Sequence, residues 1–396
     1  MLFVLSEAVK AGWIDRTACR AITPEYAATL PRSTLREGDV LVSKTGVYFG
    51  RSAVVTADLA GANTIAHVGV LRLKRRFDPY FVSTFLNCAY GYSQLRRRGI
   101  KATRPEIKLI EFADISIPTV SSSLAEAVRR TVFVAGRIRD DALSINEGAE
   151  LLLQSSLGLG DWDTASPLAY ERSSLDVYEG RRLDAEYFAP RVRSLIERLA
   201  RHDLTVGGVA PPRYERFSAG NGGDFQYIEI GGVCADGTAW AETVPHAEAP
   251  SRAAWFVKGG DVITSTVRPI RRLSAVIAPE QSGFVCSSGF VVLRPRSIAP
   301  EVLLTYLRLP PICELMNLHT SASLYPAISE GDLLGLPIPR IEPHVQDAIV
   351  AAVQRAQTSR HRVALLLDAA KRAVEIAVED SETAAVAWLS AAMEAR

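Results

Sequence analysis

One segment of the sequence occurs twice, and this repeat constrains the fold more than any other feature. Residues 36–43 (REGDVLVS) return 222 positions later as residues 258–265 (KGGDVITS), and the alignment then holds without a gap for dozens of residues. After the loss of one residue, residues 115–118 (ISIP) align with residues 336–339 (LPIP) at an offset of 221. A long unit that is present twice predicts two similar modules related by a pseudo-twofold axis.

Length and composition agree with two modules. A chain of 396 residues suits two domains with connecting segments. Hydrophobic residues make up 48% and charged residues 22% of the chain, which is enough apolar material for two cores. The 45 basic and 44 acidic residues give a net charge of +1, so any nucleic-acid binding must come from local patches.

The cysteines and the N-terminus predict a cytosolic protein. The five cysteines form no ligand cluster with metal spacing and no disulfide framework; they are Cys19, Cys88, Cys234, Cys286 and Cys313. No apolar stretch approaches the roughly 20 residues that span a bilayer. Residues 1–5 (MLFVL) lack the basic start and the length of a signal peptide.

Each copy of the repeat combines strands with a helix. In the first copy, residues 39–43, 52–56 and 67–73 are short β-branched runs separated by glycines, and a helical pattern follows from about residue 79 to residue 95. The second copy has the same pattern from residue 261 to residue 318. The expected fold class is therefore α/β (α+β), with the module present twice.

A long amphipathic helix follows each module. Apolar residues recur at intervals of three and four; in the first helix they are Leu124, Val128, Val132, Ala135, Ile138, Ala142, Ile145, Ala149 and Leu152. In the second helix they are Val345, Ile349, Ala352, Ala356, Val363, Leu366, Ala370, Val374 and Ala377. A helix of about 35 residues is ~50 Å long, which exceeds what a compact domain needs and suits a spacer.

Three arrangements of these helices are open. Each stripe could pack into its own domain, or the two helices could pair with each other as an antiparallel coil. Further apolar residues widen both stripes beyond a two-helix seam, which suggests partner helices from another chain; they include Phe133, Leu143, Leu151, Leu365 and Leu367. The candidate docking residues are Val128, Val132, Phe133, Ile138, Ile145, Ile349, Val363, Leu366 and Leu367.

These patterns divide the chain into six segments: a first module (1–120), a long helix (121–157), a linker (158–183), a second module (184–341), a second long helix (342–380) and a C-terminal tail (381–396). The second module opens with residues 183–190 (LDAEYFAP) and a short helix at 191–199. The counterpart of Asp184 in the first module would stand at 184 − 222 = −38, so the first module lacks roughly its first 40 residues.

The arrangement resembles the specificity subunit of type I restriction-modification systems over almost the whole chain. The resemblance lies in the opening at 183–190, the Gly-Asp-Val-Leu/Ile strand starts at 38–41 and 260–263, and the Ile-Pro closures at 117–118 and 338–339. Residues 338–346 (IPRIEPHVQ) are similar to that family's hinge into its long helix.

The resemblance implies two target recognition domains, each reading one half of a split DNA sequence, and two helices that set the spacing between the halves. It also implies two docked methyltransferase subunits. Those subunits, and not this chain, would bind S-adenosylmethionine and methylate adenine N6, and restriction would need a further ATP-driven subunit. The shortened first module could be a complete domain of reduced form, the result of a wrongly assigned start, or a half that another polypeptide completes.

DNA contacts in the second module are expected in three loops, because phosphates attract Lys and Arg while base edges pair with Arg, Asn and Gln. Residues 267–272 place Arg268, Arg271 and Arg272 between two strand patterns. Residues 213–223 contribute Arg213, Tyr214, Arg216 and Asn221 beside flexible glycines, and residues 321–325 contribute Ser323 and Tyr325. Solvated surface turns are the alternative for each loop.

In the first module, Lys44, Tyr48 and Arg51 occupy the position of the Arg268 loop. Homologous positions with different side chains are what two readers of different half-sites would show. The densest cationic cluster consists of Arg96, Arg97, Arg98, Lys101 and Arg104. It could neutralise phosphates or could be a solvated helix end.

Motifs of an enzyme are weak. Residues 78–81 (DPYF) are similar to the Asp-Pro-Pro-Tyr motif of adenine methyltransferases but lack its second proline, and their counterpart is PEVL at 300–303. Asp39 and Lys44 would suit a nuclease strand, yet Lys44 becomes Thr266 in the second copy and clustered carboxylates are missing. The histidines are scattered; they are His67, His202, His246, His319, His344 and His361.

The sequence therefore leaves three hypotheses. The first is a non-catalytic DNA-recognition subunit that binds no cofactor itself, the second is a self-contained DNA-modifying or cleaving enzyme, and the third is a coiled-coil assembly adaptor without DNA reading.

Overall fold

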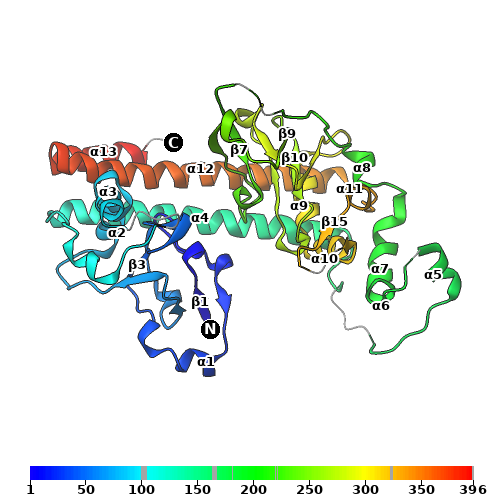
Figure 1. Cartoon of the computed structure of the whole chain (residues 1–396), viewed down its shortest axis with the longest axis horizontal. Coiled ribbons are helices and arrows are strands. Elements are labelled where there is room, and N and C mark those ends of the chain that lie inside the picture. The colour runs from blue at the N-terminus through cyan, green and yellow to red at the C-terminus, as the bar shows by residue number, and fades with distance from the viewer. Residues whose placement is uncertain are drawn as a thin grey trace. The chain divides into compact units, whose positions relative to one another are not determined.

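The chain folds into two compact units (Figure 1). Unit 1 contains residues 1–142 and 358–396, and unit 2 contains residues 143–357. The computed structural model describes residues 1–99, 105–162, 167–180, 182–218, 220, 222–321 and 324–394. Two long helices, α4 (Ser122–Ser156) and α12 (Pro343–Glu379), contribute residues to both units.

Unit 1 has two three-stranded sheets in its N-terminal part. The first has the order β2-β1-β5 and the second has the order β4-β3-β6. The strands are β1 (Leu2–Val4), β2 (Arg20–Ala21), β3 (Val40–Ser43), β4 (Ser52–Val54), β5 (Asn63–Thr64) and β6 (Val68–Leu71). The helices are α1 (Pro24–Ala28), α2 (Pro79–Asn87) and α3 (Ala89–Arg98), together with parts of α4 and α12 and all of α13 (Glu382–Glu394).

Unit 2 repeats this plan with additions. Its sheets have the orders β8-β7-β12-β9, β11-β10-β13 and β14-β15. The strands are β7 (Asp224–Ile228), β8 (Glu242–Pro245), β9 (Ala253–Phe256), β10 (Val262–Ser265), β11 (Ser274–Val276), β12 (Val285–Ser287), β13 (Phe290–Leu293), β14 (Thr320–Ser321) and β15 (Ala327–Ile328). The helices wholly within it are α5 (Ser174–Gly180), α6 (Ala185–Phe188), α7 (Pro190–Leu199), α8 (Val206–Val209), α9 (Pro300–Arg308), α10 (Pro310–Leu318) and α11 (Glu330–Leu334).

The sequence repeat is a structural repeat in which strand register is preserved. Val40 pairs with Val54 and Leu71, while Val262 pairs with Val276 and Leu293, so each residue in the second set is 222 positions after its counterpart. The prediction of a β-rich module that occurs twice is confirmed. Because a slip of one residue would turn every side chain to the opposite face, the shared register means that the two modules share a core pattern.

The outer sheets also correspond. β5 pairs in parallel with β1, and β12 pairs in parallel with β7. Phe3 faces Asn63 in unit 1, and Tyr227 faces Val285 in unit 2. The structural match therefore begins at β1 and β7, and α6, α7 and α8 precede the part of unit 2 that has a counterpart.

The Gly-Asp-Val motif forms the same turn in both units. Gly38 and Gly260 have φ of 82° and 85°, a left-handed conformation that favours glycine. The buried carboxylates of Asp39 and Asp261 close the turn by accepting the backbone N–H of the residue three positions earlier, at 2.9 and 2.8 Å. The motif is thus explained by backbone geometry.

The helix predicted from residue 79 to residue 95 is wrong in one respect, because the structure has two helices there. α2 ends at Asn87, and Cys88 is extended with φ −78° and ψ 170°. The second copy breaks at the same place, where Pro310 disfavours a helical conformation of the preceding Leu309. The first copy adopts this break without a proline.

The two predicted long helices are confirmed, and within unit 1 they pack against each other. Leu124 and Val128 lie in one buried cluster with Ala370 and Val374. Ala135 lies in the next cluster with Val363 and Leu366. From the first cluster to the second, residue numbers rise along α4 and fall along α12, so these parts of the two helices are antiparallel.

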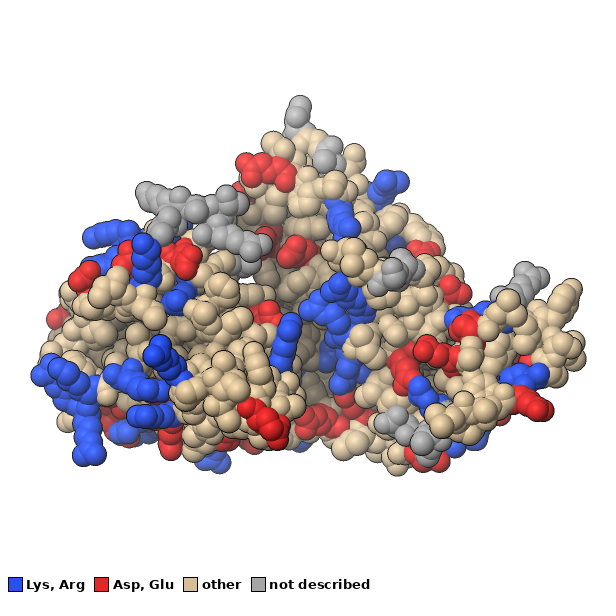
Figure 2. Space-filling view, turned by 60° about the horizontal axis from the view of Figure 1, so that its bottom comes forward, with Lys and Arg blue, Asp and Glu red and all other residues tan. Residues whose placement is uncertain are grey.

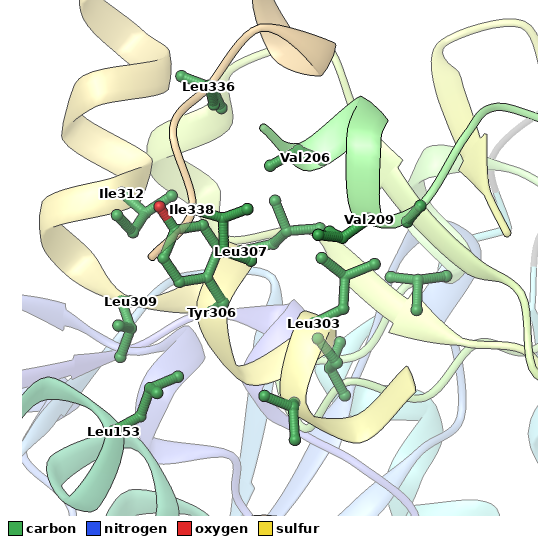
Figure 3. Packing of buried hydrophobic residues seen from close by; sticks show 14 of the residues in the cluster. Leu153, Val206, Val209, Leu303, Tyr306, Leu307, Leu309, Ile312, Leu336 and Ile338 are labelled. Atoms are coloured by element: carbon green, nitrogen blue, oxygen red, sulfur yellow. The ribbon is translucent and has the colours of Figure 1, made fainter. Parts of the chain in front are cut away.

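The core of unit 2 is built around α9 (Figure 3). Leu303, Tyr306 and Leu307 are buried together with side chains from α8 and from the closing segment at 336–338. Leu153 of α4 belongs to the same cluster. The Tyr306 hydroxyl donates to the carbonyl of Pro337, which satisfies its only polar group. The module is therefore packed onto the C-terminal part of α4.

The last segment of the chain, expected to be a tail, contains helix α13. Ala385 and Leu389 are buried in the cluster that contains Phe81 and Phe85 of α2. None of the helices in the described part of the chain combines the length and the apolar character needed to cross a membrane.

Candidate nucleic-acid interface

The candidate interface lies at the loops that leave the central strand of each module. The first hairpin loop (residues 44–51) joins β3 to β4, and the second hairpin loop (residues 266–273) joins β10 to β11. Ser43 N–H donates to the Arg51 carbonyl at 2.9 Å, and Ser265 N–H donates to the Leu273 carbonyl at 2.8 Å. The two loops are therefore closed by equivalent backbone hydrogen bonds.

A second segment runs beside each hairpin loop. It follows α3 in the first module and α10 in the second. Ile107 N–H donates to the Lys44 carbonyl at 3.1 Å, and Ile328 N–H donates to the Thr266 carbonyl at 3.0 Å. Leu324 and Tyr325, from the loop predicted as a separate weak candidate, contact Arg268 of the second hairpin loop.

Arg268 and Tyr325, which come from two predicted loops, meet in unit 2. The Arg268 guanidinium lies 5.1 Å from the centroid of the Tyr325 ring, and its Nη2 donates to the Leu324 carbonyl at 3.3 Å. Tyr325 is 63% exposed and Leu324 is 74% exposed. A planar cation stacked on an exposed ring can contact phosphates, guanine edges and base faces.

Arg271 and Arg272 are adjacent but differ in exposure and in binding partner. Arg271 is exposed at the end of a 3-10 helix at Pro269–Arg271. Arg272 is turned to α4, where its Nη2 lies 2.5 Å from both carboxylate oxygens of Glu150. Arg308, on α9, lies close to the same carboxylate with its Nε 3.9 Å away. Burial lowers the pKa of Arg308, and the positive charge of Arg272 lowers it further.

The loop at 213–223 is also divided between internal and exposed residues. Arg213 binds the buried Asp261 with two hydrogen bonds of 2.7 and 3.0 Å, and this hydrogen bonding raises the pKa of Arg213. Tyr214 is 61% exposed and its hydroxyl donates to Glu330. Arg216 is exposed, and its backbone bridges to Trp255 of β9. Asn221 and Ser323 lie outside the described residues.

In unit 1 the first hairpin loop carries an aromatic ring, Tyr48, that two cations contact. The Arg51 guanidinium lies 4.9 Å from the centroid of the Tyr48 ring, and the Lys10 ammonium lies 5.7 Å from it. Lys44, Tyr48 and Arg51 are each half-buried. Lys10 was missed by sequence reasoning because no motif links it to a loop 38 residues away (48 − 10).

The arginine cluster at the end of α3 is partly tied to the fold. Arg96 and Arg97 are exposed. The Arg98 guanidinium donates to the carbonyls of Asp114 and Gln94. Cations at a helix C-terminus are stabilised by the helix dipole even without a ligand. Lys101 and Arg104 lie outside the described residues.

The residues predicted to dock a partner fall into two groups. Most of them are buried within this chain, as are Val128, Val132, Ile349, Val363 and Leu366. Ile138, Ile145 and Leu367 are half-buried, and Phe133 is 50% exposed while it stacks on Tyr80 at 4.8 Å between ring centroids. The buried group packs the chain itself, so Phe133 is the most accessible of these candidates.

Charges of both signs share the surface (Figure 2). On the face that Figure 2 shows, Lys and Arg side chains gather in several local groups among Asp and Glu side chains. This distribution agrees with a net charge of +1. In the part of the chain that the structure describes, His, Cys, Asp and Glu side chains do not gather in groups of three that could hold a metal ion.

Comparisons with known sequences give no match: no family model matches the chain, and no curated protein matches it.

Among solved structures, the chain matches chains from type I restriction-modification systems over 98% or more of its length, at low identity. One match is a chain from a study of complex assembly and conformational transition of the type I R-M system, with 20% identity, a TM-score of 0.30, and coverage of 100% of this chain and 91% of that chain. The HsdS subunit from Thermoanaerobacter tengcongensis has 19% identity and a TM-score of 0.28, with coverage of 100% and 90%. The type I S subunit from M. genitalium has 13% identity and a TM-score of 0.30, with coverage of 98% and 88%.

Proposed function

We propose that this chain is the non-catalytic DNA-recognition subunit of a type I restriction-modification complex or a related methylation-based defence complex. The observation that carries the proposal is the pair of hairpin loops, which start from the same strand register but present different side chains. One loop presents Tyr48 in contact with two cations, and the other presents Arg268 on Tyr325. Equivalent frames with different cationic and aromatic tips suit two readers of different half-sites.

Within this proposal the two readers are the modules at 1–120 and 184–341, and the spacers are the helices at 121–157 and 342–380. Phosphate contacts come from exposed cations such as Arg96, Arg97 and Arg271. Base readout comes from the tips of the hairpin loops. The near-neutral net charge then limits non-specific binding, because only the local cations release counterions from DNA.

The partners in this proposal are double-stranded DNA and two methyltransferase subunits, with an ATP-dependent restriction subunit in a complex that also cleaves. Methyl transfer with S-adenosylmethionine belongs to the partner subunits. Large apolar side chains that remain exposed on the long helices support partner contacts there; they are Phe133, Leu151 and Leu365, which are 50%, 65% and 49% exposed.

The first test compares the purified chain with a complex that contains a co-expressed methyltransferase. We expect the chain alone to transfer no methyl group and to cleave no DNA, and the complex to bind one duplex sequence preferentially from a random library. Methylation or cleavage by the chain alone would favour a self-contained enzyme instead. A complex that assembles but shows no sequence preference would favour an assembly adaptor.

A further inference from the structure

Arg272 occupies a backbone position that the first module gives to glycine. Its φ of 59° and ψ of 36° are left-handed, a conformation that costs free energy for residues with a Cβ. The equivalent residue at an offset of 222 is Gly50, whose φ is 83°. The same turn is therefore made twice, once by the residue that suits it and once by an arginine.

The Arg272 side chain is held by α4. Its Nη2 lies 2.5 Å from both carboxylate oxygens of Glu150, whose side chain is 21% exposed. The backbone of the same residue is held by α9, because Nη1 of Arg308 donates to the Arg272 carbonyl at 3.0 Å. Arg308 is 9% exposed at its side chain and lies 3.9 Å from Glu150. Both ends of Arg272 are thus attached to helices outside the loop.

Among the described residues of the first module, the equivalent positions form no such network. At the offset of 221 that aligns α2 with α9, the counterpart of Arg308 is Asn87, which donates to the Ser52 carbonyl at 2.7 Å. The counterpart of Glu150 at an offset of 221 is Lys371, which pairs with Asp368 on its own helix. The second module alone combines an arginine at the turn with a carboxylate on the long helix.

The second hairpin loop, which contains Arg272, also presents Arg268 and Arg271. Arg268 also has a left-handed backbone, with φ 52° and ψ 63°, and its N–H donates to the Pro326 carbonyl at 2.8 Å. Two strained residues within one short loop persist only when the surroundings fix them. The Glu150 carboxylate is the charged anchor of one of them, Arg272.

We propose that Glu150, Arg272 and Arg308 form a positioning network that fixes the second hairpin loop on α4, so that Arg272 sets the place of the reading residues and does not itself contact DNA. The inference rests on the proposed DNA-recognition function. Its structural half, an anchored loop, is independent of that function. Because α4 also carries the spacer role, the network links the position of a reading loop to the element that sets the distance between half-sites.

The structural half is tested by hydrogen exchange on the full chain without DNA. We expect E150Q to raise exchange at the amides of Arg271, Arg272 and Ser274 by about tenfold or more, as the loss of a charge-assisted hydrogen bond predicts. The control is E147Q, which removes an exposed carboxylate from the same helix one turn earlier. Equal exchange in E150Q and wild type would overturn the network.

The functional half is tested by DNA binding of the complex to a duplex selected from a random library and to a scrambled duplex. We expect E150Q and R272G each to reduce the ratio of the two affinities by at least about fivefold, the lower range for one bidentate base contact. Glycine keeps the left-handed turn relaxed, as at Gly50, so R272G removes the side chain with little change to the backbone.

E150Q separates positioning from direct contact because it leaves the positive charge of Arg272 in place. A direct phosphate contact predicts that E150Q binds as well as wild type or better, and that result would overturn the positioning role. R271A serves as the reference for a phosphate contact. It is expected to lower the slope of log K against log salt concentration by about 0.9 in magnitude. If the wild-type complex does not distinguish the two duplexes, the proposed function fails, while the exchange experiment still decides the structural half.

Discussion

Two buried aspartates begin the central strands and are the most informative single residues of the repeat. Asp39 and Asp261 are 4% and 3% exposed, and each closes a turn with its carboxylate. Their arginine partners differ. Asp39 pairs with Arg72, which is 45% exposed at its side chain, whereas Asp261 pairs with Arg213, which is 14% exposed. The same carboxylate is therefore satisfied in two different ways.

We expect D261N to destabilise unit 2 by about 3 kcal/mol, because it removes the nearer anion of the largely buried Arg213 guanidinium and leaves only the Glu215 carboxylate, 3.5 Å away. D39N should cost unit 1 only about 1–2 kcal/mol, since water can solvate Arg72. Denaturant-induced unfolding, monitored by hydrogen exchange in each unit, measures both losses of stability. Equal losses in the two units would contradict this account of the partners.

Two glycines of the first hairpin loop, Gly46 and Gly50, are predicted to differ in how much stability is lost when each is replaced by alanine. Gly46 and Gly50 have φ of 72° and 83°, but a Cβ at Gly46 would meet open space while a Cβ at Gly50 would lie 2.7 Å from the Tyr92 ring. We expect G46A to cost unit 1 about 1–2 kcal/mol for the left-handed backbone alone. G50A should cost about 1–3 kcal/mol more, because of overpacking. A thermal melt that shows the two variants to be equally stable would argue against the contact with Tyr92.

The sequence predicted the roles of some residues but could not predict those of others. The loop arginines were found because cations between strands are easy to recognise. The division of these arginines into exposed and internal ones depends on distant carboxylates. Arg272 binds Glu150, which is 122 residues away, and Arg213 binds Asp261, which is 48 residues away. Neither pairing has a local signal.

At the scale of elements, periodicity predicted the strands and the long helices well. β-branched runs and the repeat predicted β3, β4 and β6 within a few residues of their bounds, since strand burial leaves a clear pattern. The break between α2 and α3 was missed because no proline marks it in the first copy. Helix α13 was missed because its many apolar residues are spread around the helix and form no stripe on one face.

The antiparallel packing of α4 and α12 in unit 1 depends on buried apolar residues rather than on exposed ones. Leu366 is 1% exposed and its neighbour Leu365 is 49% exposed. We expect L366D to destabilise unit 1 by more than about 3 kcal/mol, because it buries an unpaired charge. L365D should change stability by less than about 0.5 kcal/mol. Circular dichroism during denaturation measures both.

The same pair of variants tests the proposed docking of partners on the long helices. L365D keeps the fold but adds a charge to an exposed apolar position. Loss of methyltransferase co-purification with folded L365D would support a partner contact at this position. Full retention would move the docking surface to other exposed positions such as Phe133.

For the whole molecule, the repeat is the feature from which function follows. The central sheets of the two modules keep strand register to the residue, and the modules differ in the loops, where, under the proposed function, selection for different targets would act. The sequence alone could predict this division, because the alignment holds in the strands and fails in side-chain type at positions 44–51. It could not predict which loop residues meet, since the stacking of Arg268 on Tyr325 joins segments 57 residues apart (325 − 268).

The central claim is that this chain chooses the DNA sequence on which partner subunits act. The most direct measurement is genome-wide mapping of methylated adenines in cells that contain the methyltransferase, with the wild-type chain, without the chain, and with the R268A/R271A variant. We predict that the wild-type chain adds methylation at one sequence pattern, that this pattern disappears without the chain, and that it is lost or altered with the variant. A methylome that is identical in all three cells would contradict the account.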